Sequence, residues 1–267
     1  MTQPDSRSQP LGPENAGFDL TGRTALVTGA SRGIGRAIAV AFAAHGADVA
    51  LGGRDTTALD ETRAAVEAHG RKAIVLPADV TDPEAVQGMV DAAISGLGHL
   101  DTVVNNAGGN NFMIPFAQVR PSGWEKVMRL NLDSVVQVSR AVAPHLLERR
   151  TGSIINVSSV TGLMGVPLMS HYATAKAAVI ALSKSLAVEW AWAGVRCNAL
   201  VPGWVATELT EFARGDAGME QGLLSRVPMQ RWATPEEIAG PAVFLASDAA
   251  SFITGHALVV DGGLAAG

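Results

Sequence analysis

Short runs of β-branched and aliphatic residues alternate along this chain with longer segments of helical periodicity. The apolar runs occupy residues 23–29, 47–53, 72–79, 100–108, 152–159, 195–203 and 256–263. Helical patterns lie at 33–46, 56–70, 122–149, 171–192 and 235–246. Parallel strands need a crossover of roughly a dozen residues or more, which a helix usually supplies. The alternation therefore predicts an α/β fold, a Rossmann-type doubly wound parallel sheet of about seven strands with helices on both faces.

Three helix starts are indicated by a hydroxyl residue followed three positions later by a glutamate, the spacing of reciprocal capping. These pairs are Thr81 with Glu84, Ser122 with Glu125, and Thr234 with Glu237. Each hydroxyl is predicted to be the N-cap of its helix.

The chain has 267 residues, and no linker, charge block or repeat divides residues 19–267. A single domain over that range is therefore predicted. Residues 1–18 are polar and rich in Pro, Gly and Asn, and they lack the basic start and apolar run of a secretory signal. We expect them to form a flexible N-terminal tail.

Composition argues against several functional classes. The net charge is −5, with acids and bases mixed along the chain, so the basic face that nucleic acid requires is not expected. No apolar run reaches the roughly 18 to 20 residues of a membrane span, which predicts a cytoplasmic protein. The single cysteine, Cys197, excludes an intramolecular disulfide, and the six histidines show no close ligand pair, so no metal site is expected.

A glycine-rich segment, residues 27–37, follows the first predicted strand and opens the first predicted helix. Glycines at such a crossover let backbone amides and the helix N-terminus face a pyrophosphate, so we expect a dinucleotide there. The loop residues predicted to contact it are Gly29, Ser31, Arg32, Gly33, Ile34 and Gly35.

The end of the second strand bears on the choice of dinucleotide. An NAD enzyme usually has an acid there to accept hydrogen bonds from the ribose, whereas this chain has Gly53 followed by Arg54. Arg54 and Arg32 suit the 2′-phosphate of NADP, which is therefore favoured over NAD. NAD is the alternative, with Asp55 turned towards the ribose.

Polar and glycine-rich segments also end the next strands, at 105–109, 156–159 and 202–207. In open parallel sheets, ligands bind at the carboxyl ends of the strands, so these segments are expected to meet at one crevice. The cofactor residues predicted at these ends and at the end of the third strand are Asp79, Val80, Asn106, Ala107, Gly108, Pro202, Gly203, Val205 and Thr207.

The only tyrosine, Tyr172, stands four positions before Lys176, so both side chains share one face of a helix. An ammonium about 6 Å away, at an effective dielectric near 20, favours the phenolate by roughly 3 kcal/mol. The pair therefore suits proton transfer to or from an alcohol, although an isolated pair is more often an interface tyrosine and a solvated lysine. The adjacent His171 is expected to contact substrate or solvent, because successive helix residues diverge by about 100°.

With these motifs the chain resembles the short-chain dehydrogenase/reductase family from about residue 18 to its end. The matching residues are Thr28, Gly29, Gly33, Gly35, Asn105, Asn106, Ala107, Gly108, Asn131, Ser159, Tyr172, Lys176, Pro202 and Gly203. The resemblance implies hydride transfer between a nicotinamide cofactor and a carbonyl or secondary alcohol. It also implies catalytic roles for Asn131, Ser159, Tyr172 and Lys176, with Lys176 and Tyr172 contacting the cofactor as well.

The substrate is less constrained. Residues 204–232 look like the family's substrate lid, and within the family the chain is most similar to 3-oxoacyl thioester reductases and gluconate-type sugar dehydrogenases. Arg149 and Arg150 give only one of the two basic patches expected for an acyl carrier protein, so that partner is doubtful. The apolar helix at 171–192 predicts a homodimer or homotetramer. A non-catalytic dinucleotide-binding module is the alternative of another class.

Overall fold

The computed structural model describes residues 17–266, and over that range the strands form one sheet in the order β3-β2-β1-β4-β5-β6-β7. Every neighbouring pair is parallel. The strands are β1 (Thr24–Thr28), β2 (Asp48–Gly53), β3 (Ala73–Pro77), β4 (Thr102–Asn105), β5 (Gly152–Val157), β6 (Val195–Pro202) and β7 (Ala257–Val260). The predicted doubly wound parallel sheet is confirmed. Of the predicted tail, residues 1–16 lie outside the described residues.

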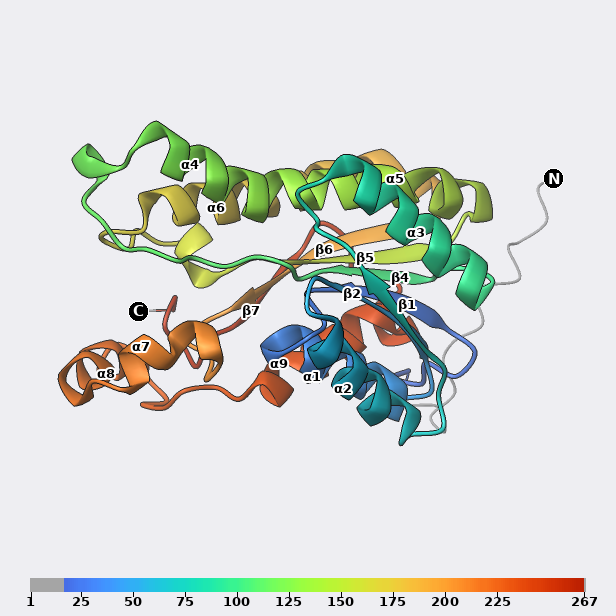
Figure 1. Cartoon of the computed structure of the whole chain (residues 1–267), viewed down its shortest axis with the longest axis horizontal. Coiled ribbons are helices and arrows are strands. Elements are labelled where there is room, and N and C mark those ends of the chain that lie inside the picture. Colours follow the sequence, from blue (N-terminus) through green and yellow to red (C-terminus); the bar gives the residue numbers. More distant parts are fainter. Residues whose placement is uncertain (1–16, 267) are drawn as a thin grey trace.

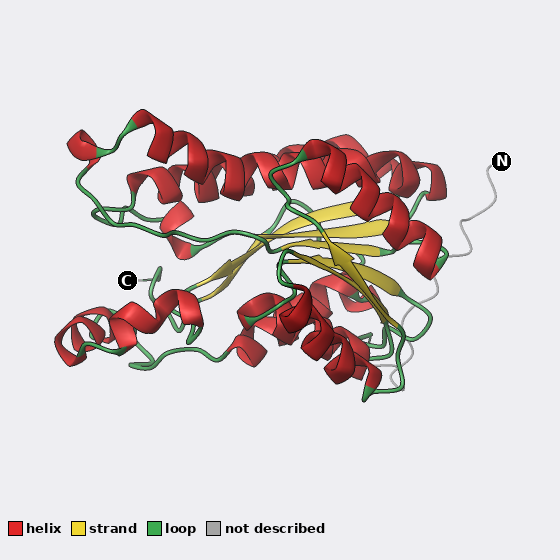
Figure 2. Ribbon diagram, viewed as in Figure 1, coloured by secondary structure: helices red, strands yellow, loops and turns green. Residues whose placement is uncertain are grey.

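Helices cover both faces of the sheet (Figures 1 and 2). On one face lie α1 (Gly33–Ala44), α2 (Thr56–Glu67) and α9 (Pro235–Ala246). On the other lie α3 (Pro83–Leu97), α4 (Pro121–Met128), α5 (Ser134–Arg149) and α6 (Ser170–Trp190). The strand order reverses direction at β1, from which the chain moves first towards β3 and then, through β4, towards β7. Such a reversal opens a crevice at the carboxyl ends of the adjacent strands.

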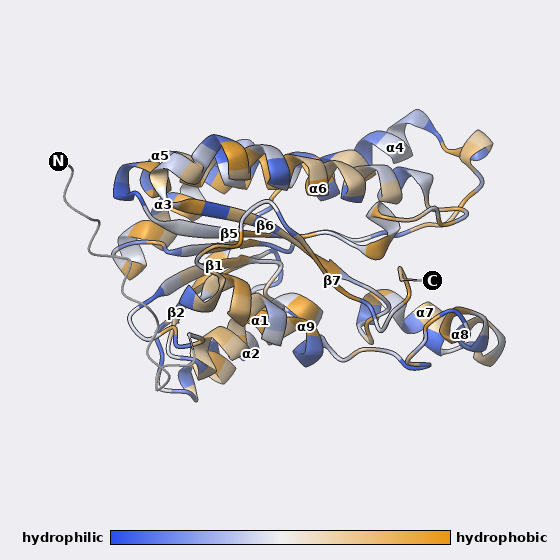
Figure 3. Ribbon diagram, turned by 180° about the vertical axis from the view of Figure 1, so that it is seen from behind, coloured by the Kyte–Doolittle hydropathy of each residue, from blue (hydrophilic) through white to orange (hydrophobic). Residues whose placement is uncertain are grey.

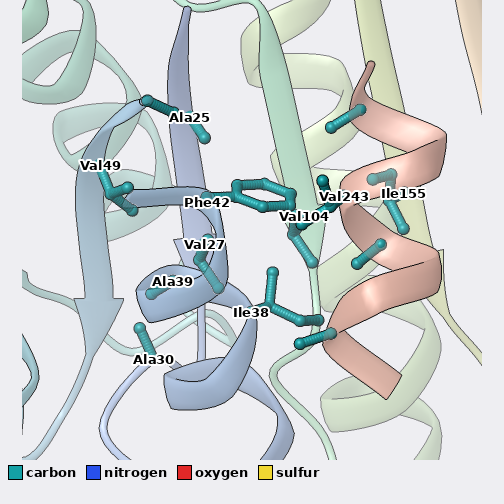
Figure 4. Close-up of a cluster of buried hydrophobic side chains, with 14 of the residues drawn as sticks. Ala25, Val27, Ala30, Ile38, Ala39, Phe42, Val49, Val104, Ile155 and Val243 are labelled. Carbon is teal, nitrogen blue, oxygen red and sulfur yellow. The ribbon is translucent and has the colours of Figure 1, made fainter. Parts of the chain in front are cut away.

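Apolar side chains fix α1 and α9 to the sheet. Ile38 and Phe42 of α1 are fully buried, and they pack with Val243 of α9 against Val27 and Val104 of the central strands (Figure 4). Colouring by hydropathy likewise shows β7 and much of α1 and α9 as hydrophobic (Figure 3). Removing a ring such as that of Phe42 typically costs about 3–5 kcal/mol. This packing holds the N-terminus of α1 under the glycine-rich loop.

Of the three predicted N-caps, one is confirmed and two are wrong. Thr234 and Glu237 do form a reciprocal capping box at α9. At α3, however, the N-cap is Asp82, whose carboxylate accepts a hydrogen bond from the Glu84 N–H at 2.9 Å. The Thr81 hydroxyl instead donates to the Asp79 carboxylate. A charged acceptor one residue nearer the helix therefore displaces the threonine.

Helix α4 also starts earlier than predicted. Arg120 is its N-cap and Pro121 its first residue, a position that proline favours, so Ser122 lies inside the helix.

The predicted long helix at 122–149 is interrupted. A π-helical turn, Arg129–Asp133, separates α4 from α5 and contains Asn131. Such turns widen the helix by one residue and are frequent at functional sites. Apolar periodicity continues through the turn, so the sequence pattern does not reveal it.

After β6, the chain leaves the sheet to form two short helices, α7 (Glu211–Arg214) and α8 (Ala217–Leu224), and returns at Ala233, which bridges Val205. This excursion spans the predicted lid segment and lies beyond the carboxyl end of the sheet (Figure 1). Over residues 17–266, no helix combines the length and apolar character needed to cross a membrane.

Candidate active site

A cleft crosses the carboxyl ends of the strands, between the glycine-rich loop, the N-terminal part of α6 and the start of the lid segment. Its walls contain nearly all of the residues predicted from the sequence. These are Gly29, Ser31, Arg32, Gly33, Ile34, Arg54, Asp79, Val80, Asn106, Ala107, Gly108, Ser159, Tyr172, Lys176, Pro202, Gly203, Val205 and Thr207. Segments separated by more than 150 positions in the sequence therefore meet at one cleft.

The glycine-rich loop has the shape of a phosphate cradle. Gly29 and Gly33 have φ values of 65° and 54°, which residues with a Cβ rarely adopt. Asn106 fastens the loop from β4, since its Nδ2 donates to the carbonyls of Thr28 and Gly29 at 3.0 and 3.1 Å. The loop then leads into the N-terminus of α1, and so backbone donors and the positive end of a helix meet at the cleft, as a pyrophosphate requires.

Gly35 differs from the other loop glycines because it does not line the cleft. A Cβ at Gly35 would overlap the carbonyl oxygen of Gly29 and lie 2.5 Å from Asn106 Nδ2. Its absence lets α1 approach the loop, so Gly35 shapes the cradle through packing.

Charged side chains at the end of β2 and β3 define one end of the cleft. Arg54 is largely exposed, 3.9 Å from the Asp79 carboxylate. Hydrogen bonds from Thr81 lower the pKa of Asp79. Asp55 caps α2 by accepting the Ala58 N–H at 3.1 Å, so its carboxylate is already engaged.

Arg32, from the glycine-rich loop, forms an ion pair with Glu208 at the start of the lid segment. Both side chains are about two-thirds exposed, at 66% and 63%. This contact connects the two sides of the cleft.

Tyr172, Lys176 and Ser159 meet at the other end of the cleft. Lys176 Nζ lies 5.6 Å from the centre of the Tyr172 ring and donates to the Val157 carbonyl at 2.9 Å. Burial raises the pKa of Tyr172 to about 12, although a hydrogen bond with Ser159 partly offsets this rise. Burial also lowers the pKa of Lys176 to about 8. The predicted lowering of the Tyr172 pKa by Lys176 is therefore wrong for these side chains, because the loss of hydration on burial dominates the shift.

Asn131 is fully buried and does not line the cleft, although its neighbour Leu130 in the same π-helical turn does. Its side chain accepts the Gly109 N–H at 2.9 Å and donates to the Gly109 carbonyl at 2.9 Å. It also donates to the Val127 carbonyl at 3.0 Å. Asn131 therefore fixes the segment that follows β4.

Several residues of the cleft were missed by the sequence reasoning. Ala78 and Leu130 directly precede predicted residues, and Thr210 lies three positions after Thr207, so extending each predicted motif by a few residues would have found them. His171 was predicted to contact substrate or solvent, and this is wrong: it is fully buried and bonded to Asn110. Among residues 17–266, no cluster of three His, Cys, Asp or Glu side chains is arranged to hold a metal ion.

Comparison with known proteins agrees with this geometry. The profile of the family described as "Enoyl-(Acyl carrier protein) reductase" matches residues 29–265. Gluconate 5-dehydrogenase of Gluconobacter oxydans (strain 621H) is 41% identical over 247 residues, which cover 92% of this chain and 96% of the relative. A 3-oxoacyl-[acyl-carrier-protein] reductase of Synechocystis sp. is 39% identical over 92% of this chain and 98% of its own length.

Among solved structures, a gluconate 5-dehydrogenase from Burkholderia cenocepacia J2315, in complex with NADP and tartrate, is 37% identical with a TM-score of 0.90. The match covers 94% of this chain and 98% of that one. The similarity in sequence and in structure therefore extends over almost the full length of this chain and of each relative. The chain belongs to the short-chain dehydrogenase/reductase family, and it is an NAD(P)-dependent oxidoreductase that acts on CH–OH groups.

Proposed function

We propose that the chain interconverts a small carbonyl compound and its secondary alcohol, with NADPH as the preferred cofactor. The observation that carries the proposal is the meeting of Tyr172, Lys176 and Ser159 at one end of a glycine-lined cleft. A catalytically inert binding module would have no need for a half-buried phenol beside a buried ammonium. Burying them costs free energy that ordinary surface residues do not incur.

In the direction of reduction, Tyr172 is the proton donor. Its pKa of about 12 keeps the hydroxyl protonated at neutral pH, so it can donate a hydrogen bond, and then the proton, to the carbonyl oxygen. Ser159, which already bonds Tyr172, orients the same oxygen. Lys176 supplies a positive charge that stabilises the phenolate left after transfer. Bound NADPH would supply the hydride, held by the glycine-rich loop and the segments that end β4 and β6.

Asn131 acts behind this group. Its bonds to Gly109 hold the segment after β4 in place, next to the Asn106–Gly108 wall of the cleft. Resemblance to the family also implies that Asn131 holds a water in a proton relay. This role suits its position, because Asn131 and Lys176 both approach Gly108: a Cβ there would lie 2.8 Å from Asn131 Oδ1 and 3.3 Å from Lys176 Nζ.

The preference for NADPH rests on Arg54. No carboxylate stands at position 53, and Asp55 is committed to capping α2. Asp79 is the carboxylate near Arg54, but the distance of 3.9 Å and the exposure of both side chains make this a weak ion pair that a phosphate can replace. The exposed guanidinium can therefore bind the 2′-phosphate through charge-assisted hydrogen bonds. The relative from Burkholderia cenocepacia also binds NADP.

A free carbonyl substrate is favoured over one carried by an acyl carrier protein. Arg149, half of the basic pair that such a partner would use, instead donates to Asp101 at 3.0 Å. That contact lies at the amino end of the sheet, since Asp101 immediately precedes β4. A sugar acid or polyol remains the second candidate, because two of the similar proteins are gluconate 5-dehydrogenases. A homodimer or homotetramer assembled through α6 is part of the same proposal.

Reduction of a panel of ketones, keto acids and 3-oxoacyl thioesters, assayed with NADPH and with NADH, tests this function. We expect turnover of at least one carbonyl class, with a higher kcat/KM for NADPH. Dinucleotide binding without turnover across the panel would instead support the non-catalytic alternative.

A further inference from the structure

The turn that follows β5 lies directly against the backbone of α6, the helix that carries Tyr172 and Lys176. This single 3₁₀ turn, Val160–Gly162, begins immediately after Ser159. A Cβ on Gly162 would lie 2.8 Å from the Lys176 carbonyl carbon and 2.9 Å from its carbonyl oxygen. Ordinary van der Waals contacts begin near 3.4 Å, so a side chain at position 162 would push the turn away from α6.

Ser158 makes a second contact with Lys176. Its buried hydroxyl donates to the Lys176 carbonyl at 2.8 Å. A carbonyl in the middle of an α-helix already accepts the N–H group four positions later, so the hydroxyl uses the second lone pair of the oxygen. The helix therefore does not need this bond to satisfy its backbone. The effect of the bond is to fasten the end of β5 to α6.

The side chain of Lys176 adds a third contact, because its Nζ donates to the Val157 carbonyl at 2.9 Å. Residues 157–162 therefore hold both the backbone and the ammonium of Lys176, which stands one helical turn after Tyr172. Ser159 lies inside this segment. The distance from the Ser159 hydroxyl to Tyr172 thus depends on how closely the segment approaches α6.

The Ser159 hydroxyl can be displaced only a little without losing its contacts. It bonds Tyr172, and it also accepts the Thr161 N–H at 3.2 Å. Hydrogen bonds between two oxygens span only roughly 2.5–3.0 Å, and a misplacement of about 1 Å can lower a rate by about 100-fold. A Cβ on Gly162 would force the turn and α6 apart by several tenths of an ångström, which is enough to impair proton transfer.

We propose that Gly162 and Ser158 are positioning residues for the reaction. By docking the turn on the backbone of Lys176, they set the distance between the hydroxyls of Ser159 and Tyr172. They act through Ser159 and not on the substrate itself. This inference rests on the roles of Ser159 and Tyr172 in the proposed carbonyl reduction.

Two glycines of the same loop provide a matched test. Neither Gly162 nor Gly165 has a positive φ, so alanine is compatible with both backbones. A Cβ on Gly165 would have no atom within 4 Å, whereas one on Gly162 would meet α6. With NADPH and the panel compound that the wild type reduces fastest, Gly162→Ala should lower kcat by about 10- to 100-fold. KM and NADP⁺ affinity should be unchanged, because Gly162 does not line the cleft. Gly165→Ala should keep the wild-type kcat.

A double-mutant cycle shows whether Gly162 acts through Ser159. In a Ser159→Ala background the hydroxyl that Gly162→Ala would misplace is already absent, so the second change should lower kcat by less than about 2-fold. A residue that only maintained the fold would lower kcat by the same factor in both backgrounds.

Ser158→Ala gives the same information from a milder change. It removes one hydroxyl and leaves the Lys176 carbonyl with its bond inside the helix, so the fold should be retained. We expect kcat to fall by about 3- to 10-fold in the wild-type background and by less than about 2-fold in Ser159→Ala. Thr174→Ala, which removes a hydroxyl–carbonyl bond on the exposed side of α6, is the control and should keep the wild-type kcat.

The outcomes separate the positioning role from the proposed function. A near-normal kcat in either folded variant would remove that residue from the proposal, and equal losses in both backgrounds would overturn the action through Ser159. Thermal unfolding shows which variants are folded, and Ser158→Ala alone decides if Gly162→Ala is not. A near-normal kcat in Ser159→Ala, or no turnover of any panel compound by the wild type, would instead overturn the proposed function.

Discussion

A charged side chain is buried at each end of the sheet, but only the one at the amino end has a partner of opposite charge. At the amino end, the Asp101 side chain, only 7% exposed, accepts hydrogen bonds from the Thr24 backbone at 2.9 Å and from Arg149 at 3.0 Å, and it lies 3.0 Å from His99 Nε2. At the carboxyl end, Lys176 is 3% exposed and has no carboxylate partner within 17–266; its contacts are the Val157 carbonyl and the face of Tyr172.

The presence or absence of a charged partner distinguishes a side chain that stabilises the fold from one that is available for a reaction. A buried charge is tolerated in a scaffold when it is paired and its hydrogen bonds are satisfied, as Asp101 is. A buried charge without a counter-ion has a shifted pKa, as Lys176 has, and such groups are concentrated at functional sites. The amino end therefore stabilises the fold, while the carboxyl end retains unpaired groups for a ligand.

The largest effect is expected at the carboxyl end, from Tyr172→Phe. Removal of the proton donor should lower kcat by about 10²–10⁴-fold, the usual contribution of general acid catalysis. The free energy of unfolding should change little, because one buried hydroxyl with a single side-chain partner is lost. Steady-state kinetics and NADP⁺ binding by calorimetry are the measurements, with binding expected to stay near the wild-type value. A variant with near-normal kcat would remove Tyr172 from the mechanism.

At the amino end, Asp101→Ala should have the reverse pattern. It leaves Arg149 and the Thr24 amide without their buried acceptor, so we expect a loss of about 3–5 kcal/mol in the free energy of unfolding. Turnover per folded molecule should be unchanged, because the site lies at the opposite edge of the sheet. Denaturant unfolding measures the loss. Asp60→Ala, which removes an exposed partner of Arg63, is the control and should change stability by less than about 0.5 kcal/mol.

The pH dependence of the reaction tests the unpaired lysine directly. Lys176 has a lowered pKa of about 8, so raising the pH through that value removes its positive charge, while Tyr172 keeps its proton until about pH 12. The kcat/KM of reduction should therefore be level below pH 7 and fall by about 10-fold per pH unit above pH 8 to 9. Lys176→Arg keeps a charge at all these pH values and should remove the alkaline limb, even at a reduced rate. An alkaline limb that survives in this variant would assign it to another group.

Much of this architecture could be predicted from the sequence, because it depends on local patterns. Apolar alternation gives the strands and their crossovers, and the carboxyl ends of parallel strands meet at one edge, so Gly29, Asn106 and Tyr172 were assigned to one crevice correctly. What the sequence does not reveal depends on burial and on partners distant in the chain. The π-helical turn at Asn131 leaves the apolar periodicity unchanged, and the direction of the Tyr172 pKa shift depends on desolvation that spacing alone cannot supply.

The same limit applies to contacts between distant segments. Asp101 meets Arg149 across 48 positions, and His171 meets Asn110 across 61. Neither pair stands in a recognisable motif. Helix caps are only partly predictable from the sequence. Thr234 is the N-cap that its local pattern predicts, whereas Asp82 replaces the predicted Thr81 as the N-cap of α3. Local spacing therefore predicts such contacts only where no stronger neighbour competes.

The smallest effect is expected from Glu208, the exposed partner of Arg32 at the carboxyl end of the sheet. This pair adds a third case to the buried paired Asp101 and the buried unpaired Lys176, namely a charge that is paired but exposed. Arg32 is bound by Glu208, and an exposed ion pair is worth about 0–1 kcal/mol, so a ligand phosphate can replace the carboxylate. Glu208→Gln should release Arg32 and strengthen NADP⁺ binding by up to about 5-fold, with NAD⁺ binding unchanged. Calorimetric titration of both cofactors at low and high salt measures this, with Glu211→Gln on the neighbouring helix as control, and the gain should shrink at high salt. An equal gain for NAD⁺ would mean that Glu208 repels the shared pyrophosphate rather than competing for Arg32 with the 2′-phosphate.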